Sequence, residues 1–156
     1  MVEKLLYLHV IMDKKVSEFL EQQRISVLSI LQTDGSIHSA TLHYASISNP
    51  PSFFFMTEKD SKKCASLLEG QVQVASVVIG FSEEEFTTFQ AEGKVRIASK
   101  EADAEWKTYI NKYPTRSKGR ENPSYVLLEF TPSWWRYSDT KASPQVKIES
   151  SNSYTK

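Results

Sequence analysis

The sequence predicts a mainly β protein, an antiparallel β-barrel of about six strands with helices at its start, middle and end. Apolar residues recur at helical spacing in the stretches 13–23 and 101–113. Most other apolar residues lie in short runs rich in β-branched and aromatic side chains, which is typical of strands. Turn-forming pairs such as Asp34-Gly35 and Asn49-Pro50 separate these runs.

The composition is ordinary for a globular protein and excludes several functional classes. The chain has 156 residues, which is enough for one domain with a core, and its 19 basic residues equal its 19 acidic residues. Without a net positive field, neither a nucleic-acid partner nor an anionic membrane is expected. No run approaches the roughly 20 apolar residues of a membrane span. The single cysteine, Cys64, rules out an internal disulfide framework and a cysteine-based zinc site, and it fits a cytoplasmic protein.

The chain divides into an extension, a domain and a tail. Residues 1–12 have an apolar run that is short, contains His9 and lacks a small-residue cleavage site, so we expect a loosely docked N-terminal extension and not a targeting signal. Residues 13–139 form the barrel domain. Residues 140–156 are rich in Ser, Lys and Thr and short of apolar residues, which predicts a disordered tail.

Each element of the domain has a local signal. Asp13 is a suitable N-cap for the first helix, whose apolar residues fall on one face. The run 72–79 is nearly all apolar, as in a strand buried on both faces, and Gly93 predicts a bulge within a long strand. The expected elements are, in order, a helix at 13–23, strands at 25–31, 36–47 and 52–57, a short helix from Ser61 to Gly70, strands at 72–79 and 86–98, a helix at 101–113, a mobile polar loop at 114–123 and a strand at 125–130.

The stretch from Phe55 to Lys63 carries the candidate chemistry. A strand delivers Thr57, a polar turn follows, and Ser61 stands where the N-cap of a short helix belongs. Lys62 and Lys63 fall in the first turn of that helix, where the helix dipole normally disfavours positive charge. An anion such as a phosphate explains them, because free N–H groups, lysines and hydroxyls all bind phosphate oxygens. The alternative is an ordinary capped helix with solvated lysines.

The order of elements from Val16 to Asp139 resembles the pyridoxamine 5′-phosphate oxidase-like, FMN-binding split-barrel superfamily. The similar parts are the opening helix, the strand Val27–Leu31, the Asp34-Gly35 turn, the strand Phe54–Thr57 running into Ser61-Lys62-Lys63, the segment Phe89–Val95 with its glycine, and the run from Glu129 to Asp139. This resemblance implies a split antiparallel barrel that binds FMN.

The resemblance also implies where the flavin binds. In such proteins the turn matching Ser61-Lys62-Lys63 grips the FMN phosphate, and the strand matching residues 40–42 presents backbone groups to the ring system. A second subunit commonly completes the pocket, so the resemblance implies a homodimer in which Trp135 and Arg136 reach a flavin held mostly by the partner chain. The residues so implied in cofactor binding are Ala40, Thr41, Leu42, Met56, Thr57, Ser61, Lys62, Lys63, Thr88, Trp135 and Arg136.

The sequence also departs from the oxidase pattern. Family oxidases usually have an arginine where Ala40 falls and a glutamine near Thr88. They end with Arg-x-His-Asp-Arg, whereas this chain has Arg136-Tyr137-Ser138-Asp139-Thr140. Because the lost groups serve vitamin B6 and flavin contacts in the oxidase, pyridoxamine-phosphate oxidase activity is not expected.

Functions of different classes therefore stay open. The first is a flavin-dependent oxidoreductase of unknown substrate, in which FMN or a deazaflavin supplies the chemistry and no side chain has an assigned catalytic role. The second is a non-enzymatic ligand-binding or regulatory module that kept the barrel and lost the cofactor. Trp134 and Trp135 are either flavin contacts or core and interface anchors. No metal is expected, because His38 and His43 point to opposite faces of a predicted strand.

Overall fold

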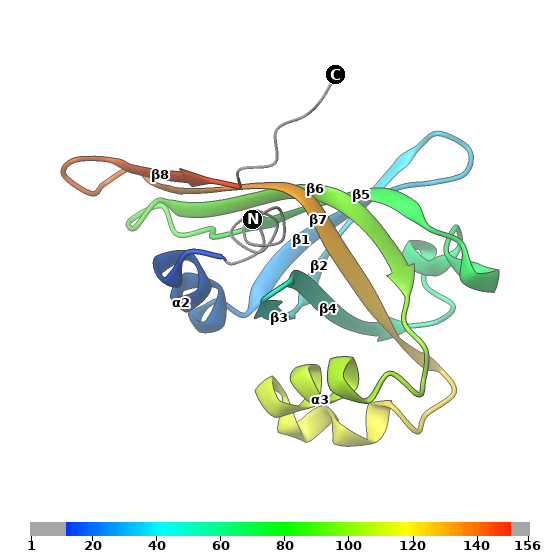
Figure 1. The fold of residues 1–156 in the computed structure, drawn as a ribbon. Coiled ribbons are helices and arrows are strands. Elements are labelled where there is room, and N and C mark those ends of the chain that lie inside the picture. The colour runs from blue at the N-terminus through cyan, green and yellow to red at the C-terminus, as the bar shows by residue number, and fades with distance from the viewer. Residues whose placement is uncertain (1–11, 151–156) are drawn as a thin grey trace, which may run out of the picture.

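The structure is a computed structural model that describes residues 12–150 (Figure 1). It confirms the mainly β split-barrel prediction, because the described residues form one eight-stranded antiparallel sheet with flanking helices. No helix in this part of the chain is long and apolar enough to cross a membrane. The elements are α2 (Lys14–Gln22), β1 (Ile25–Leu31), β2 (Ile37–His43), β3 (Ala45–Ser48), β4 (Pro51–Glu58), β5 (Gln73–Ile79), β6 (Thr87–Ile97), α3 (Asp103–Lys112), β7 (Tyr125–Asp139) and β8 (Val146–Glu149), with short 3-10 helices η1 (Lys62–Cys64), η2 (Leu68–Gly70) and η3 (Pro114–Gly119).

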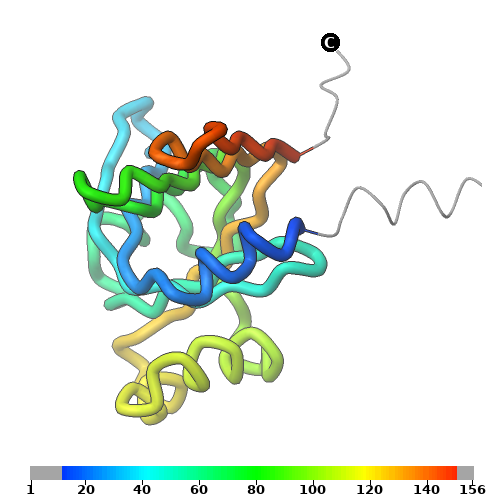
Figure 2. The backbone as a smooth tube through the Cα atoms, turned by 90° about the vertical axis from the view of Figure 1, so that its left-hand side faces the viewer, coloured from blue at the N-terminus to red at the C-terminus, as the bar shows by residue number. Residues whose placement is uncertain are grey.

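The sheet closes on itself at Tyr44. Its strand order is β2-β1-β5-β6-β7-β4-β3, so the strands at its ends, β2 and β3, follow each other in the sequence with only Tyr44 between them. The single strand predicted at 36–47 is therefore wrong: β2 pairs with β1, and β3 pairs with β4. The local sequence has no turn signal at Tyr44, so pairing with distant strands determines the bend. In Figure 2 the strands wrap round a common interior, with α3 and η3 beneath it.

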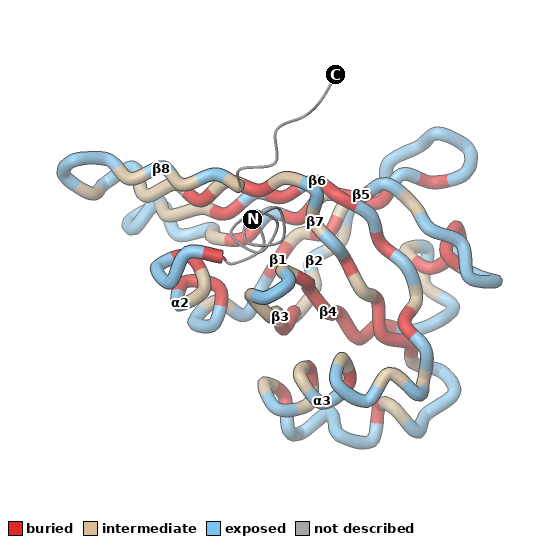
Figure 3. Tube along the Cα trace, in the orientation of Figure 1, coloured by how far each residue is buried: buried red, intermediate tan, exposed pale blue. Residues whose placement is uncertain are grey.

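Strand β4 is buried along most of its length (Figure 3), and the buried residues form one cluster on each of its sides. One cluster fills the barrel, and the other lies between α3 and strands β3, β4 and β7. Alternate side chains of a strand point to opposite faces, so Phe53 and Phe55 enter the barrel whereas Phe54 and Met56 pack against α3. Because both faces of β4 are covered, the strand is buried continuously from Ser52 to Thr57.

Strand β5 is not buried on both faces as its apolar sequence predicts. Ala75, Val77 and Ile79 point into the barrel, but Val74 and Val78 are 56% and 37% exposed. The apolar outer face has no covering helix in the described chain, and the sequence alone does not distinguish a buried face from an exposed apolar one.

The predicted bulge at Gly93 is confirmed. The pairing of β6 with β7 shifts register between Glu92 and Gly93. A Cβ atom at position 93 would lie 2.1 Å from the carbonyl oxygen of Thr131, so only glycine allows the strands to approach this closely. The strand predicted at 125–130 continues through Pro132 to Asp139 as β7.

The prediction of a disordered tail from residue 140 is wrong for β8. This strand pairs antiparallel with β7, and Val146 and Ile148 pack against the barrel core. Glu149 also forms an ion pair with Arg136 at 2.6 Å. Apolar residues at alternate positions were enough to dock the segment, although the average composition of the tail is polar. Residues 151–156, and residues 1–11 of the predicted extension, lie outside the described chain.

The end of α3 holds the bend at Tyr44. The Tyr113 hydroxyl lies 2.7 Å from the carbonyl oxygen of Tyr44 and 3.1 Å from that of Arg24. The Tyr44 hydroxyl in turn donates to the carbonyl oxygen of Leu20 at 2.7 Å. These bonds connect α2, the sheet corner and α3.

Lys112 reinforces the same junction. Its ammonium donates to the carbonyl oxygens of Gln23 (2.6 Å) and Leu20 (3.3 Å) at the C-terminal end of α2. Such carbonyls have no partner inside their own helix, so an external donor satisfies them. Burial, together with the nearby Arg24 charge, lowers the pKa of Lys112 to about 8.

Replacing Lys112 by methionine is expected to lower the free energy of unfolding by about 2 kcal/mol, because the helix-end carbonyls lose their donor in a partly buried place. Urea denaturation followed by tryptophan fluorescence measures this change. Lys107→Met, on the exposed face of the same helix, is the matched control and should change stability by less than about 0.5 kcal/mol. Equal effects of the two substitutions would contradict the role of Lys112.

Candidate functional site

A pocket of about 260 Å³ opens beside the turn that follows β4. It brings together Thr57, Ser61 and Lys63, which the sequence predicted to lie near a phosphate, and Met56, which the resemblance implied in cofactor binding. Hydroxyl groups and a cation are a suitable donor set for a phosphate. The complete lining is Met56, Thr57 and Glu58 from β4, Ser61 and Lys63 from the turn, Arg116 from η3 and Tyr125 from β7.

The turn at Ser61 is not the helix that the sequence predicts. Lys62–Cys64 form only a 3-10 helix, and the Ser61 side chain makes no capping bond to a backbone N–H. Its hydroxyl donates instead to the sulfur of Cys64 at 3.6 Å, and burial raises the pKa of that thiol. So short a segment has little dipole, so attraction for an anion comes from side chains and not from a helix N-terminus.

The neighbouring lysines point in different directions. Lys63 lines the pocket and Lys62 does not. Hydrogen bonds from Ser36 lower the pKa of Asp34, and the charge of Lys62 acts on Asp34 in the same direction. Lys62 therefore lies within electrostatic reach of Asp34, and of the two lysines only Lys63 lines the pocket.

Arg116 supplies a second cation that sequence analysis did not assign. The polar loop predicted at 114–123 begins with η3, and this short helix carries Arg116 to the pocket. The segment of basic residues was a signal, but nothing in it indicated which cation faces the turn. Burial, followed by the charges of Arg116, Arg24 and Lys112, lowers the pKa of His43. In the pocket lining itself, the two positive charges of Lys63 and Arg116 exceed the one negative charge of Glu58.

Close packing brings η3 to the pocket. Gly119 is buried against Met56, and a Cβ atom at position 119 would lie 2.2 Å from the Met56 sulfur. The absence of a side chain therefore lets η3 approach β4. A neighbouring pocket of about 230 Å³ is lined by Arg116 and Lys118 and shares Met56 and Tyr125 with the first.

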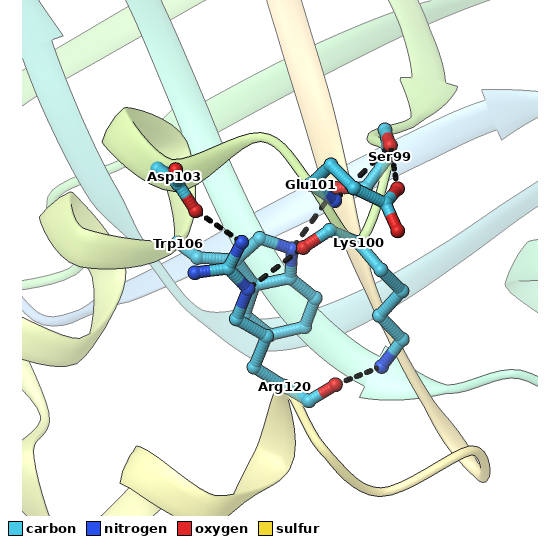
Figure 4. A network of polar contacts seen from close by, with 6 residues as sticks. All are labelled: Ser99, Lys100, Glu101, Asp103, Trp106 and Arg120. Carbon is cyan, nitrogen blue, oxygen red and sulfur yellow. Dashed lines mark hydrogen bonds and ion pairs between the residues drawn. The ribbon is translucent and has the colours of Figure 1, made fainter.

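Lys100 holds the chain that follows η3 (Figure 4). Its ammonium donates to the carbonyl oxygens of Arg120 (2.7 Å), Asn122 (3.1 Å) and Tyr125 (2.8 Å). The Arg120 side chain donates back to the Lys100 carbonyl at 2.7 Å and pairs with Asp103. Residues 120–125 are therefore fixed to the start of α3, which contradicts the prediction of a mobile loop there.

The predicted ring-binding residues lie on an edge strand. Ala40, Thr41 and Leu42 belong to β2, which pairs only with β1 among the described strands. The other edge of β2 therefore has unpaired backbone N–H and C=O groups. These groups can donate and accept hydrogen bonds, which is what contacts to the polar edge of a flavin ring require.

Thr88, Trp135 and Arg136 lie far from the pocket in the same chain. None of the three residues lines the pocket, and Trp135 lies ten positions beyond Tyr125 along the bulged strand β7. Trp135 is 8% exposed and stacks on Phe89 with ring centroids 5.9 Å apart, as a core residue does. Within one chain these residues and the phosphate pocket are not brought together.

No metal centre accompanies the pocket. Within residues 12–150, no group of three His, Cys, Asp or Glu side chains is close enough to hold a metal ion. His38 pairs with buried Ile30 and His43 with exposed Ile25, so the histidines face opposite sides of β2.

One protein-family profile matches most of the sequence, from α2 to the end of β7. The profile described as pyridoxamine 5′-phosphate oxidase matches residues 12–139. The chain belongs to the pyridoxamine 5′-phosphate oxidase family. This membership agrees with the split barrel of the structure. A search of curated proteins found no match to the sequence.

Solved structures of other proteins share the fold. A protein of Clostridium acetobutylicum related to general stress protein 26 is 15% identical, with a TM-score of 0.63 over 86% of this chain and 92% of its own. A pyridoxamine 5′-phosphate oxidase-related, FMN binding protein of Nostoc punctiforme is 16% identical, with a TM-score of 0.61 over 86% and 87%. A heme binding protein of Mycobacterium smegmatis is 9% identical, with a TM-score of 0.65 over 91% and 61%. At these identities the likeness establishes the fold alone.

Arg116→Gln is expected to raise the pKa of His43, because it removes one of the charges that disfavour the imidazolium. An NMR titration of the histidine ring signals, assigned with His43→Gln, measures this shift. The His38 signal should not move, since it lies on the other face of β2. An unchanged pKa of His43 would show that Arg116 does not act on this part of the site.

Proposed function

We propose that the chain binds FMN, with the phosphate in the pocket lined by Thr57, Ser61, Lys63 and Arg116. The observation that carries this proposal is the meeting of hydroxyls with cations from separate elements in one pocket. Charge-assisted bonds from lysine and arginine are the strong contacts to a phosphate, and hydroxyls add neutral donors. The described residues form no ion pair with Lys63 or Arg116, so both charges are available to a ligand.

The flavin ring lies along the free edge of β2 in this proposal. Backbone groups of Ala40, Thr41 and Leu42 supply donors and acceptors there. FMN and a deazaflavin differ in the ring and not in the need for a phosphate contact, so this pocket suits either. The bound flavin supplies hydride or electron chemistry, and the protein positions it. The proposed activity is accordingly a flavin-dependent oxidoreductase with an unknown substrate.

A non-enzymatic ligand-binding module is the second candidate. Ala40 offers no charged group to a flavin, and Arg136 is already paired with Glu149. Both observations concern the part of the proposed site that would hold the flavin ring. The pocket proposed for the phosphate has the cations Lys63 and Arg116. A module of this kind binds a phosphate-bearing ligand without redox chemistry.

We also propose a homodimer formed through the outer face of β2, β1 and β5. This face exposes Ile37 (73%), Val74 (56%), Leu31 (38%) and Val78 (37%). An exposed apolar face of this kind favours association with another protein surface. In this assembly a partner chain seated there brings its Arg136 toward the flavin, whereas Trp135 is 8% exposed and stays in the core of its own chain.

Lys63→Ala and Arg116→Ala are each expected to weaken FMN binding about tenfold, since each removes one charge-assisted contact. Quenching of flavin fluorescence during protein titration measures the dissociation constant. Lys62→Ala is the matched control, because Lys62 carries the same charge next to Lys63 but does not line the pocket. Riboflavin, which lacks the phosphate, should bind all these variants equally.

Distinct outcomes separate the candidates. A yellow protein with flavin absorbance after purification supports the oxidoreductase, and colourless protein that binds neither added FMN nor a deazaflavin contradicts flavin binding. Loss of riboflavin affinity in the Lys63 variant would show that the pocket does not hold the phosphate.

Val74→Glu is expected to convert a dimer to monomers, because it places a charge in an apolar interface. Sedimentation velocity at micromolar concentration measures this change. Phe81→Glu is the control, since Phe81 is similarly exposed (55%) but lies beyond the end of β5. A monomeric parent protein would overturn the proposed assembly.

A further inference from the structure

A second hollow lies at the same end of the barrel as the phosphate pocket. Its volume is about 580 Å³, against about 260 Å³ for the phosphate pocket. Glu58 lines the phosphate pocket and Lys59 lines the hollow, as neighbouring residues at a strand end point to opposite sides. Tyr125 pairs with Glu58 and borders both spaces. The hollow is thus separate from the phosphate pocket but shares a wall with it.

The wall of this hollow is largely apolar. Leu67 and Val126 are buried at its base, and Ile97 and Ala98 at the end of β6 continue the same surface. Leu68 contributes a side chain that is 38% exposed. A volume of this size with an apolar lining and a few polar groups is typical of a site for a small organic ligand.

The rim of the hollow is fixed in place. Glu69 (φ 63°) and Gly70 (φ 77°) both have left-handed backbone, which turns the chain sharply beside Leu68. The Gln73 side chain donates to the carbonyl oxygen of Ser66 at 3.1 Å and ties this segment to β5. A ligand therefore meets a preformed shape and does not have to order the rim.

The charges around the hollow favour one anionic group. Lys59, Arg96 and Lys100 line it, against a single carboxylate from Glu69. Lys100 is already bonded to backbone carbonyls, and Arg96 forms an ion pair with Glu129 at 3.1 Å. Lys59 has no ion-pair partner among the described residues. One unpaired cation beside an apolar surface is complementary to a ligand with one negative charge and an apolar body.

We propose that this hollow, here named the Lys59 pocket, binds a monoanionic amphiphile: a small carboxylate with a hydrocarbon or aromatic body. The carboxylate pairs with Lys59, and the apolar body covers Leu67, Leu68 and Val126. This site is distinct from the proposed flavin site and does not depend on it. Because Tyr125 borders both, the ligand lies next to the wall of the phosphate pocket.

The indole of Trp106 provides a reporter for this site. Its Nε1–H donates to the carbonyl oxygen of Ser99 at 3.1 Å, and Ser99 lines the Lys59 pocket. The ammonium of Lys100 lies 4.8 Å from the Trp106 ring centroid. Occupation of the pocket is expected to shift the Trp106 indole NMR signal while the indole signals of Trp134 and Trp135, on β7, stay in place.

Octanoate is the probe for the test, and ¹⁵N–¹H NMR of the full chain measures its binding. Saturable shifts are expected at the Trp106 indole and at the amides of residues 67–70 and 97–100, with a dissociation constant of about 1 mM. Lys59→Glu should weaken octanoate binding at least about tenfold. Lys107→Glu, the same charge change on the exposed face of α3, should leave it unchanged, and acetate, which lacks the apolar body, should not bind.

Each contrary result overturns the proposal. Octanol binding as tightly as octanoate would remove the role of the charge, and shifts confined to other residues would place the ligand elsewhere. Displacement of octanoate by inorganic phosphate, with Lys63→Ala having the same effect as Lys59→Glu, would assign the binding to the phosphate pocket. Failure of FMN to bind leaves the octanoate result intact, so the two proposals fail independently.

Discussion

The bend at Tyr44 is the constraint on which the rest of the structure depends. A sheet with free edges exposes unpaired backbone groups, and here the end strands β2 and β3 are halves of one continuous segment. The sheet must therefore curl until these two strands lie together at one corner, while the outer edge of β2 stays unpaired, which produces a split barrel. The fully buried side chain of Tyr44 and the hydrogen bond from Tyr113 hold this corner against α3.

The position of α3 determines the candidate site in turn. η3 follows α3 directly, so Arg116 reaches the strand end only because the helix is anchored at the corner and at Lys100. Gly119 then permits the contact with Met56 that brings η3 beside β4. The pocket is accordingly assembled from a strand, a turn and a 3-10 helix whose order in space depends on closure of the sheet.

The physical basis of the proposed anion site differs from the one suggested by the sequence. A helix N-terminus at Ser61 was expected to supply N–H groups and a dipole, but the turn there is only a short 3-10 helix. Lys63 and Arg116 replace that contribution with full charges from two sides of the pocket. In the proposed flavin site, the phosphate end has two cations, and the ring end, with Ala40 and an ion-paired Arg136, is where the oxidoreductase and the binding module differ.

The sequence by itself determined the fold class, the main strands and helices, and the Gly93 bulge. These depend on local spacing, turn chemistry and backbone freedom, which act within a few residues. Only the tertiary structure decided which lysine faces the pocket, that Arg116 joins it, and that β8 docks on β7. These outcomes depend on strand pairing and close packing between distant segments, where local preferences are similar for the alternatives.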